Sequence, residues 1–136
     1  MSGTVSLSNV GHVAHILIDD IPNYNAMTLQ MWHEMAAAIT SINENADVRV
    51  AVIRGAGDRA FVSGANITEF EKVRSSSETT AIYNAAVKAA QSAISLCRVP
   101  VIASIQGICY GGGLGLALSC DLRYASAESK FRVPAA

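Results

Sequence analysis

The sequence predicts an α/β protein whose strands pair mainly in parallel. Segments with the period of strands alternate along the chain with segments whose apolar residues recur at helical spacing. The strand segments are rich in β-branched residues, and the stretch 48–53 is apolar enough to be covered on both faces, as strands of a parallel sheet are. This alternation of strands and helices is typical of α/β folds.

The first half of the chain contains two predicted strands and one helix. A strand is expected over 12–19, and Pro22 and Asn23 interrupt it. Thr28 is the candidate N-cap of the next helix. A turn over 43–47 then leads into the strand 48–53. The apolar face of the helix is predicted to consist of Leu29, Trp32, Ala36 and Ile39.

The second half begins with a short extended piece at 61–62, which Gly64 interrupts. Further elements are expected in chain order: a short helix over 67–73, a flexible or capping stretch over 75–77, a long helix over 78–96, a strand over 101–105 that starts at Pro100, a helix over 113–119 and a strand over 122–125. The buried stripe of the long helix is predicted to be Ile82, Ala86, Ala89, Ala93 and Leu96.

Composition restricts the class of protein. A chain of 136 residues allows one domain, and 51% hydrophobic residues with 15% charged ones indicate a globular fold. A net charge of −1 gives no electrostatic reason to expect a nucleic-acid or anionic-membrane partner. The three cysteines have no metal or redox spacing and no secretory signal is visible, so we expect a reducing, cytoplasmic location. The three histidines have no ligand spacing, so no metal site is expected.

The uncharged stretch 101–120 has the length of a membrane span. Ser104, Gln106 and five glycines interrupt it, so we interpret it as a buried strand, a turn and a helix. The last residues, 133–136, include no closing element, and the sequence is therefore expected to be cut from a longer one.

Two glycine-containing segments are the candidate chemical motifs. Gly111–Gly113 lies between a predicted strand and a predicted helix, where backbone without Cβ atoms can approach a ligand and a helix N-terminus supplies free N–H groups. A tight strand–helix crossing would need the same small residues, and this motif alone does not separate the two interpretations. The segment 61–67 has a similar order of strand, glycine and helix start, for which an ordinary turn is the simpler explanation.

A dinucleotide site is a rival interpretation for the segment 55–60, which fits the pattern G-x-G-x-x-A after a strand. Such a site requires a helix immediately afterwards, whereas residues 61–62 are predicted to be extended. We therefore reject this alternative.

Taken together, the two segments and their neighbours resemble the enoyl-CoA hydratase/isomerase (crotonase) family, from about residue 5 to the last residue. The matching pieces occur in the family's order: Asn25–Met27, Ala60–Phe61, Gly64–Ile67, Pro100–Gly107, Gly111–Gly113, Leu116–Ala117, Cys120–Ala125 and Lys130–Phe131. The resemblance implies a ClpP/crotonase superhelix of β-β-α turns. Residues 1–136 would form its acyl-CoA-binding core and stop before the C-terminal helices through which members assemble as homotrimers or hexamers.

The resemblance also implies the site. The backbone N–H groups of Ala65 and Gly112 would form an oxyanion hole for a thioester carbonyl, a role that suits preorganised amide donors. No separate cofactor is implied, because coenzyme A enters as part of the substrate. Contacts with the substrate and its CoA moiety are expected from Asn25, Ala26, Met27, Gly64, Asn66, Ile67 and Gly111.

Departures from the family pattern concern proton transfer and phosphate binding. The two positions at which hydratases carry glutamates are occupied by Gly115 and Ala135, neither of which can move a proton. Asn66 stands where an aspartate is usual and Thr68 where a lysine is common. Glu69 and Glu71 are other acids nearby, but we interpret them as a solvated helix face.

Three hypotheses follow. The first is an acyl-CoA enzyme of the enoyl-CoA hydratase/isomerase type that works through its oxyanion hole. The second is a non-catalytic acyl-CoA-binding pseudoenzyme that keeps the amides and has lost the acids. The third is a structural fragment without coenzyme A affinity.

Overall fold

Two sheets form the framework of the protein. A computed structural model describes residues 3–133, in which a five-stranded sheet has the order β1-β2-β3-β5-β7 and a three-stranded sheet has the order β4-β6-β8. The β1–β2 pair is antiparallel and every other pair is parallel, which confirms the predicted α/β class. The strands are β1 (Thr4–Val10), β2 (Val13–Asp19), β3 (Val50–Gly55), β4 (Ala60–Val62), β5 (Val101–Ile105), β6 (Ile108–Tyr110), β7 (Leu122–Ala125) and β8 (Lys130–Arg132).

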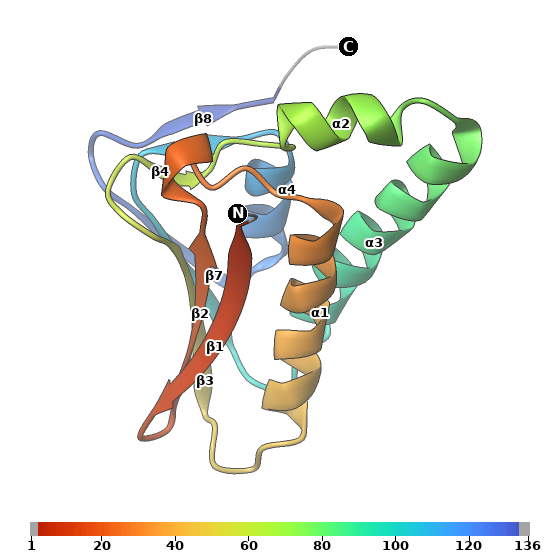
Figure 1. The fold of residues 1–136 in the computed structure, drawn as a ribbon. Coiled ribbons are helices and arrows are strands. Elements are labelled where there is room, and N and C mark those ends of the chain that lie inside the picture. The colour runs from red at the N-terminus through yellow and green to blue at the C-terminus, as the bar shows by residue number, and fades with distance from the viewer. Residues whose placement is uncertain (1–2, 134–136) are drawn as a thin grey trace.

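Four α-helices lie on one side of the five-stranded sheet (Figure 1). They are α1 (Leu29–Asn43), α2 (Ile67–Val73), α3 (Ser77–Ser95) and α4 (Gly112–Ser119), and a 3-10 turn covers Ile21–Asn23. Side chains cap three of them: Thr28 Oγ1 accepts from Met31 N at 3.2 Å, and Asn66 and Ser76 do the same for α2 and α3. The predicted N-cap and all four helices are confirmed, to within a residue or two at their ends.

The core lies between the five-stranded sheet and the helices. Alternate residues of β2 point into it, with Ala14, Ile16 and Ile18 at 0% exposure. They meet Trp32, Met35 and Ile39 of α1 in the same cluster. Burial of such aliphatic and aromatic groups is the main force that holds sheet and helices together.

The prediction that strand 48–53 is covered on both faces is wrong for the described residues. In β3, Ala51 and Ile53 are fully buried, whereas Val50 and Val52 are half-buried and Arg54 is exposed. The reason is that the helices cover only one face of this sheet.

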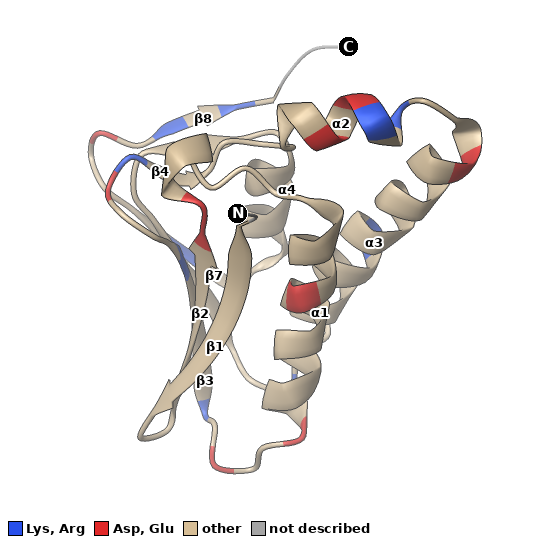
Figure 2. Cartoon of the chain, in the orientation of Figure 1, with Lys and Arg blue, Asp and Glu red and all other residues tan. Residues whose placement is uncertain are grey.

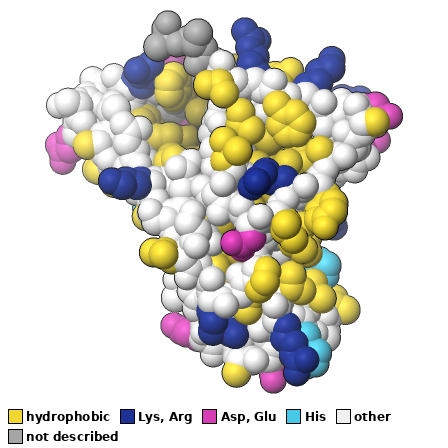
Figure 3. Space-filling model, turned by 180° about the vertical axis from the view of Figure 1, so that it is seen from behind, with side chains coloured by type: hydrophobic (Ala, Val, Ile, Leu, Met, Phe, Trp, Pro, Cys, Tyr) yellow, Lys and Arg dark blue, Asp and Glu magenta, His cyan; other side chains and the backbone are white. Residues whose placement is uncertain are grey.

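Hydrophobic side chains gather in patches on the side of the molecule that faces away in Figure 1 (Figure 3).

The predicted buried stripe of the long helix is wrong at three of its five positions: Ala86 is buried and Ala93 half-buried, but Ile82, Ala89 and Leu96 are exposed. Ile82 and Leu96 are 48% and 81% exposed, and the buried residues of α3 are Tyr83, Ala86, Ala90 and Ile94. The helix is turned so that Tyr83, not Ile82, enters the interior, where the Tyr83 hydroxyl accepts a hydrogen bond from Trp32 Nε1 at 3.0 Å. A buried hydroxyl needs such a partner, and periodicity alone does not reveal whether one exists.

Three strands went unpredicted: β1, β6 and β8. Strand β1 turns back at Gly11, whose φ is +60°, to form a hairpin with β2. Strands β6 and β8 are three residues each, too short to show a period. The uncharged stretch 101–120 contains β5, β6 and α4, and within residues 3–133 no helix is long and apolar enough to cross a membrane.

Candidate functional site

Two open cavities adjoin at Ala65. One, of about 400 Å³, is lined by Ser63, Gly64, Ala65, Tyr110, Gly111, Gly112 and Arg132. The other, of about 410 Å³, is lined by Pro22, Asn23, Tyr24, Ala26, Ser63, Ala65, Asn66, Ile67 and Thr68. The shared residues, Ser63 and Ala65, make the two cavities neighbours. The structure therefore brings seven of the predicted site residues to one place: Ala26, Gly64, Ala65, Asn66, Ile67, Gly111 and Gly112.

A single bridge to Met27 holds the Ala65 peptide in place. Met27 N donates to Gly64 O at 2.8 Å, and Asn66 N donates to Met27 O at 3.0 Å, which makes an isolated parallel bridge between residues 27 and 65. This pattern uses the peptide groups on either side of Ala65 and leaves its own N–H without an acceptor among residues 3–133. Ala65 thus lines both cavities and has a backbone N–H that no described residue uses.

The Gly112 amide is free for a different reason. Gly112 is the first residue of α4, so its N–H has no partner inside the helix, and none elsewhere in the described part of the chain. Gly111 has a φ of +56°, and its N–H donates to Arg132 O at 2.9 Å. A Cβ at Gly113 would lie 2.5 Å from Val62 O. The triple glycine therefore serves both interpretations, since Gly113 permits a close crossing and Gly112 presents a donor.

Trp32 and Tyr83 pack beside the backbone segments that contain Gly112 and Ala65. A Cβ built on Gly112 would lie 3.2 Å from Trp32 Cζ2, so the indole ring supports the start of α4. Trp32 Nε1 donates to the Tyr83 hydroxyl at 3.0 Å, and that hydroxyl reaches Met27 O at 3.5 Å. Burial raises the pKa of Tyr83, while the Trp32 hydrogen bond acts in the opposite direction. The Trp32–Tyr83 pair therefore connects the start of α4 at Gly112 to the backbone of Met27, which is hydrogen-bonded to the residues on either side of Ala65.

Asn25 and Met27 line neither of these cavities. Their exposures are 1% and 0%. The Asn25 carboxamide accepts from Asp20 N at 2.8 Å and donates to the carbonyl oxygens of Ala56 and Ala60 at 3.0 and 2.8 Å. It therefore fastens the loop after β2 to the loop after β3. Ala26 is the residue of this segment that lines one of the two cavities, and substrate contacts by all three residues stay predictions.

One of the two positions where hydratases carry a glutamate lies within the described residues. Gly115 lies in α4, one turn after Gly112. Ala135 lies outside the described residues. The interpretation of Glu69 as part of a solvated face is wrong, because its carboxylate is partly buried and accepts a hydrogen bond from Leu29 N at the start of α1. Glu71 is exposed as expected.

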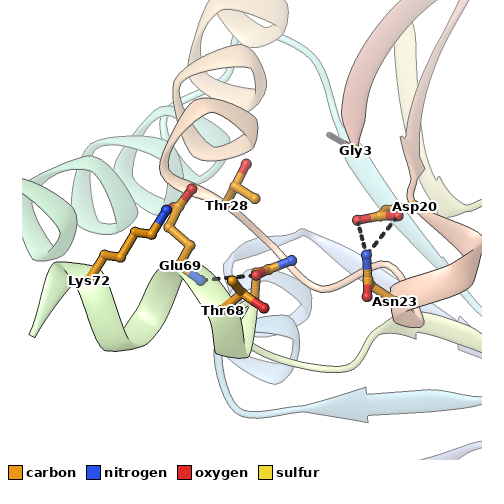
Figure 4. Close-up of a pocket in the computed structure, with 8 residues that line it drawn as sticks. Gly3, Asp20, Asn23, Thr28, Thr68, Glu69 and Lys72 are labelled. Atoms are coloured by element: carbon orange, nitrogen blue, oxygen red, sulfur yellow. Dashed lines mark hydrogen bonds between the residues drawn. The ribbon is translucent and has the colours of Figure 1, made fainter. Parts of the chain in front are cut away.

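A third, polar cavity of about 300 Å³ lies beside Glu69 (Figure 4). In this cavity, Asn23 Nδ2 donates to both carboxylate oxygens of Asp20, at 3.1 and 3.2 Å. Lys72 of α2 also lines the cavity and is its positively charged residue. Lys and Arg residues of α2 and β8 lie at the same end of the molecule (Figure 2). Sequence reasoning missed Lys72 and Arg132, because neither belongs to a motif and β8 was not predicted. Within the described ranges no group of three or more His, Cys, Asp or Glu is placed to hold a metal ion.

Comparisons with known proteins agree on one family. The sequence model of the family described as enoyl-CoA hydratase/isomerase matches residues 9–136. The peroxisomal Delta(3,5)-Delta(2,4)-dienoyl-CoA isomerase of Arabidopsis thaliana is 34% identical, over 89% of this chain and 47% of its own length. The short-chain-enoyl-CoA hydratase of Clostridium acetobutylicum is 31% identical, over 96% of this chain and 49% of its own length.

The fold agrees with solved structures as well. The crystal structure of an enoyl-CoA hydratase/carnithine racemase from Magnetospirillum magneticum superposes with a TM-score of 0.92 at 36% identity, over 98% of this chain and 50% of that one. The chain thus spans about half the length of the relatives it matches.

Proposed function

The chain belongs to the enoyl-CoA hydratase/isomerase family and has the crotonase fold, and from that premise we propose that it binds an acyl-CoA thioester and polarises its carbonyl with the amides of Ala65 and Gly112. The observation that carries the proposal is that Ala65 and Gly112 line one cavity and that neither backbone N–H has an acceptor among residues 3–133. A thioester oxygen that gains negative charge needs preorganised donors, each worth about 3 kcal/mol.

The rest of the substrate would follow the two cavities. The acyl carbonyl enters the cavity at Gly112, and the pantetheine chain passes Ala65 into the cavity lined by Ala26 and Ile67. Lys72 lines the polar cavity that shares Asn23, Asn66 and Thr68 with the second cavity, and we assign the CoA phosphates to it in place of a lysine at Thr68. The reaction class is enoyl-CoA hydration or double-bond isomerisation. Assembly as a homotrimer or hexamer and a cytoplasmic location belong to the same proposal.

A matched pair of variants tests the role of the amides. Gly112→Pro removes one N–H at the first position of α4, where proline is compatible with a helix. Gly112→Ala adds a Cβ near Trp32 as well but keeps the N–H. In a crotonyl-CoA assay that follows loss of enoyl absorbance, kcat/KM should fall about 100-fold or more in Gly112→Pro relative to Gly112→Ala. Equal activity of the two variants would contradict the proposed oxyanion hole.

A second function, acyl-CoA binding without turnover, is favoured by Gly115, where no carboxylate can act. Calorimetry with crotonyl-CoA separates the two functions. Tight binding together with an unchanged enoyl absorbance supports the binding protein, and turnover supports the enzyme. Absence of any binding would leave only the structural-fragment hypothesis.

A further inference from the structure

The carboxylate of Glu69 is shared by the first turns of two helices. Glu69 is the third residue of α2, and its backbone N–H donates to the cap residue, Asn66, at 3.1 Å. Its Oε1 atom accepts a hydrogen bond from Leu29 N, the first amide of α1. Figure 4 shows the side chain extending from α2 toward Thr28 and the start of α1. Negative charge is favourable near a helix N-terminus, so one side chain stabilises both helix starts.

This use of a glutamate differs from the usual capping arrangement. In a capping box, a glutamate at the third helical position accepts from the N–H of its own cap residue. Here that N–H is already used, because Asn66 N donates to Met27 O at 3.0 Å. The bond from Leu29 to Glu69 therefore joins the same two segments that the bridge between Met27 and Ala65 joins.

The direction of the Ala65 N–H depends on how closely these two segments are held. This N–H and Gly64 O belong to one planar peptide group and point in opposite directions. Because Gly64 O accepts from Met27 N at 2.8 Å, the Ala65 N–H is directed away from Met27. Gly64 has a φ of +130°, which only glycine adopts readily, and glycine restrains its backbone little. The hydrogen bonds between the segments therefore set the direction of the amide.

Burial does little to hold the start of α2 in place. The helix has seven residues and buries Val73 at its far end, whereas Ile67 at its start is 77% exposed. An apolar side chain that stays exposed contributes little to holding a helix against the core. The polar contacts of Asn66 and Glu69 accordingly fasten the part of α2 that follows the Ala65 peptide.

We propose that Glu69 is a positioning residue, which keeps the Ala65 amide directed at the thioester carbonyl by fastening α2 to α1. The inference rests on the proposed function, because the direction of the amide matters only if a carbonyl oxygen lies against it. Glu69 lines the polar cavity and neither of the two cavities that meet at Ala65. It therefore acts through the backbone of α2 and transfers no proton.

The carbonyl stretch of bound butyryl-CoA provides the test, because a saturated acyl group cannot be hydrated and hydrogen bonds to a carbonyl lower its stretching frequency. Isotope-edited infrared spectra with a ¹³C-labelled carbonyl are recorded at saturating protein. The shift from the frequency in water should fall to about half in Glu69→Ala, since one of two donors is misdirected. Glu69→Gln should keep the full shift, because its carboxamide oxygen still accepts from Leu29 N. Glu71→Ala, at an exposed acid of the same helix, is the control and should also keep it.

A second pair of variants removes the donor in place of the acceptor. Leu29→Pro deletes the N–H at the first position of α1, where proline is compatible with a helix, and Leu29→Ala retains it. The shift should fall in Leu29→Pro as it does in Glu69→Ala and stay full in Leu29→Ala. Thermal unfolding checks that each variant is folded, and either pair alone suffices if a member of the other fails to fold.

The outcomes distinguish the two proposals. If butyryl-CoA does not bind to the unsubstituted protein, or binds with its carbonyl stretch at the value in water, the proposed function fails. If the shift is present and stays full in Glu69→Ala and Leu29→Pro, the role of Glu69 is overturned and the oxyanion hole stands. A loss in Glu69→Gln as large as that in Glu69→Ala would also overturn it, because the charge would then matter and not the bond to Leu29.

Discussion

Asn25 illustrates how one side chain can organise the surroundings of a site without lining it. Its carboxamide satisfies one backbone N–H and two backbone carbonyls from three segments of the chain. Its backbone lies in the left-handed region, with a φ of 56°, where asparagine is better tolerated than most residues. The motif Asn25–Met27 is therefore explained by loop architecture, whatever its contacts with a substrate.

Asn25→Asp is the residue-scale test of this role. The change removes both donors to Ala56 O and Ala60 O and places a carboxylate oxygen against them in a buried position. The free energy of unfolding should fall by about 3 kcal/mol, since buried groups left unsatisfied cost about 1–3 kcal/mol each. Urea unfolding measures the loss. Asn84→Asp, at an exposed position of α3, should lose less, and an equal loss in both variants would argue against this account.

Tyr83→Phe is a second test at this scale. The substitution leaves Trp32 Nε1 without its acceptor and removes the link to Met27 O, while the ring stays in place. Because the pair supports both amides, kcat should fall about tenfold for a loss of roughly 1.4 kcal/mol, with KM nearly unchanged. Steady-state kinetics with crotonyl-CoA give both constants. A rise in KM with an unchanged kcat would indicate a role in substrate binding instead.

At the scale of elements, the helix starts place the site. Helix α2 begins directly after the Ala65 peptide because Asn66 Oδ1 accepts from Glu69 N at 3.1 Å. The family's usual aspartate would make the same cap, so the replacement by asparagine changes a charge and keeps the architecture. Glu69 in turn accepts from Leu29 N, which ties the start of α1 to α2.

Because the Asn66 side-chain oxygen caps α2, we expect Asn66→Ala and Asn66→Asp to differ in stability. Asn66→Ala should destabilise the protein by about 1 kcal/mol, whereas Asn66→Asp should leave the free energy of unfolding unchanged or slightly higher, because a carboxylate also favours a helix N-terminus. Urea unfolding of the two variants side by side provides the measurement. A loss of similar size in Asn66→Asp would show that the asparagine N–H₂ group, rather than its oxygen, matters here.

Elements with a strong local signal could be predicted from the sequence. Helices α1 and α3 have caps at Thr28 and Ser76 and a long apolar period, and β5 begins directly after Pro100. Strands β6 and β8 have no such signal, because each exists only through its pairing with a distant strand. The rotation of α3 was also beyond prediction, since it depends on the partner of Tyr83 on another helix.

At the scale of the whole molecule, two buried thiols make stability depend on pH. Burial raises the pKa of Cys109 to about 11 and that of Cys120 to about 12, from an ordinary value of 9.0. The unfolded chain loses these protons first as pH rises, so their contribution to stability is fully present below pH 9 and is lost progressively between pH 9 and about 12. The temperature of the unfolding midpoint should therefore decrease as pH rises from 9 to about 11. The double variant Cys109→Ala/Cys120→Ala should show a shallower fall, and an equally steep one would assign the effect to other groups.

The sequence alone is enough to identify the family, the α/β class and the residues whose local chemistry is decisive, such as the triple glycine and the helix caps. It is enough because turns, caps and apolar periods act over a few residues. Which groups share a cavity follows from the tertiary structure: Ala65 and Gly112 line the same cavity, and Asn25 faces inward. Those relations depend on how the helices pack on the sheet, and packing joins residues that no local pattern connects.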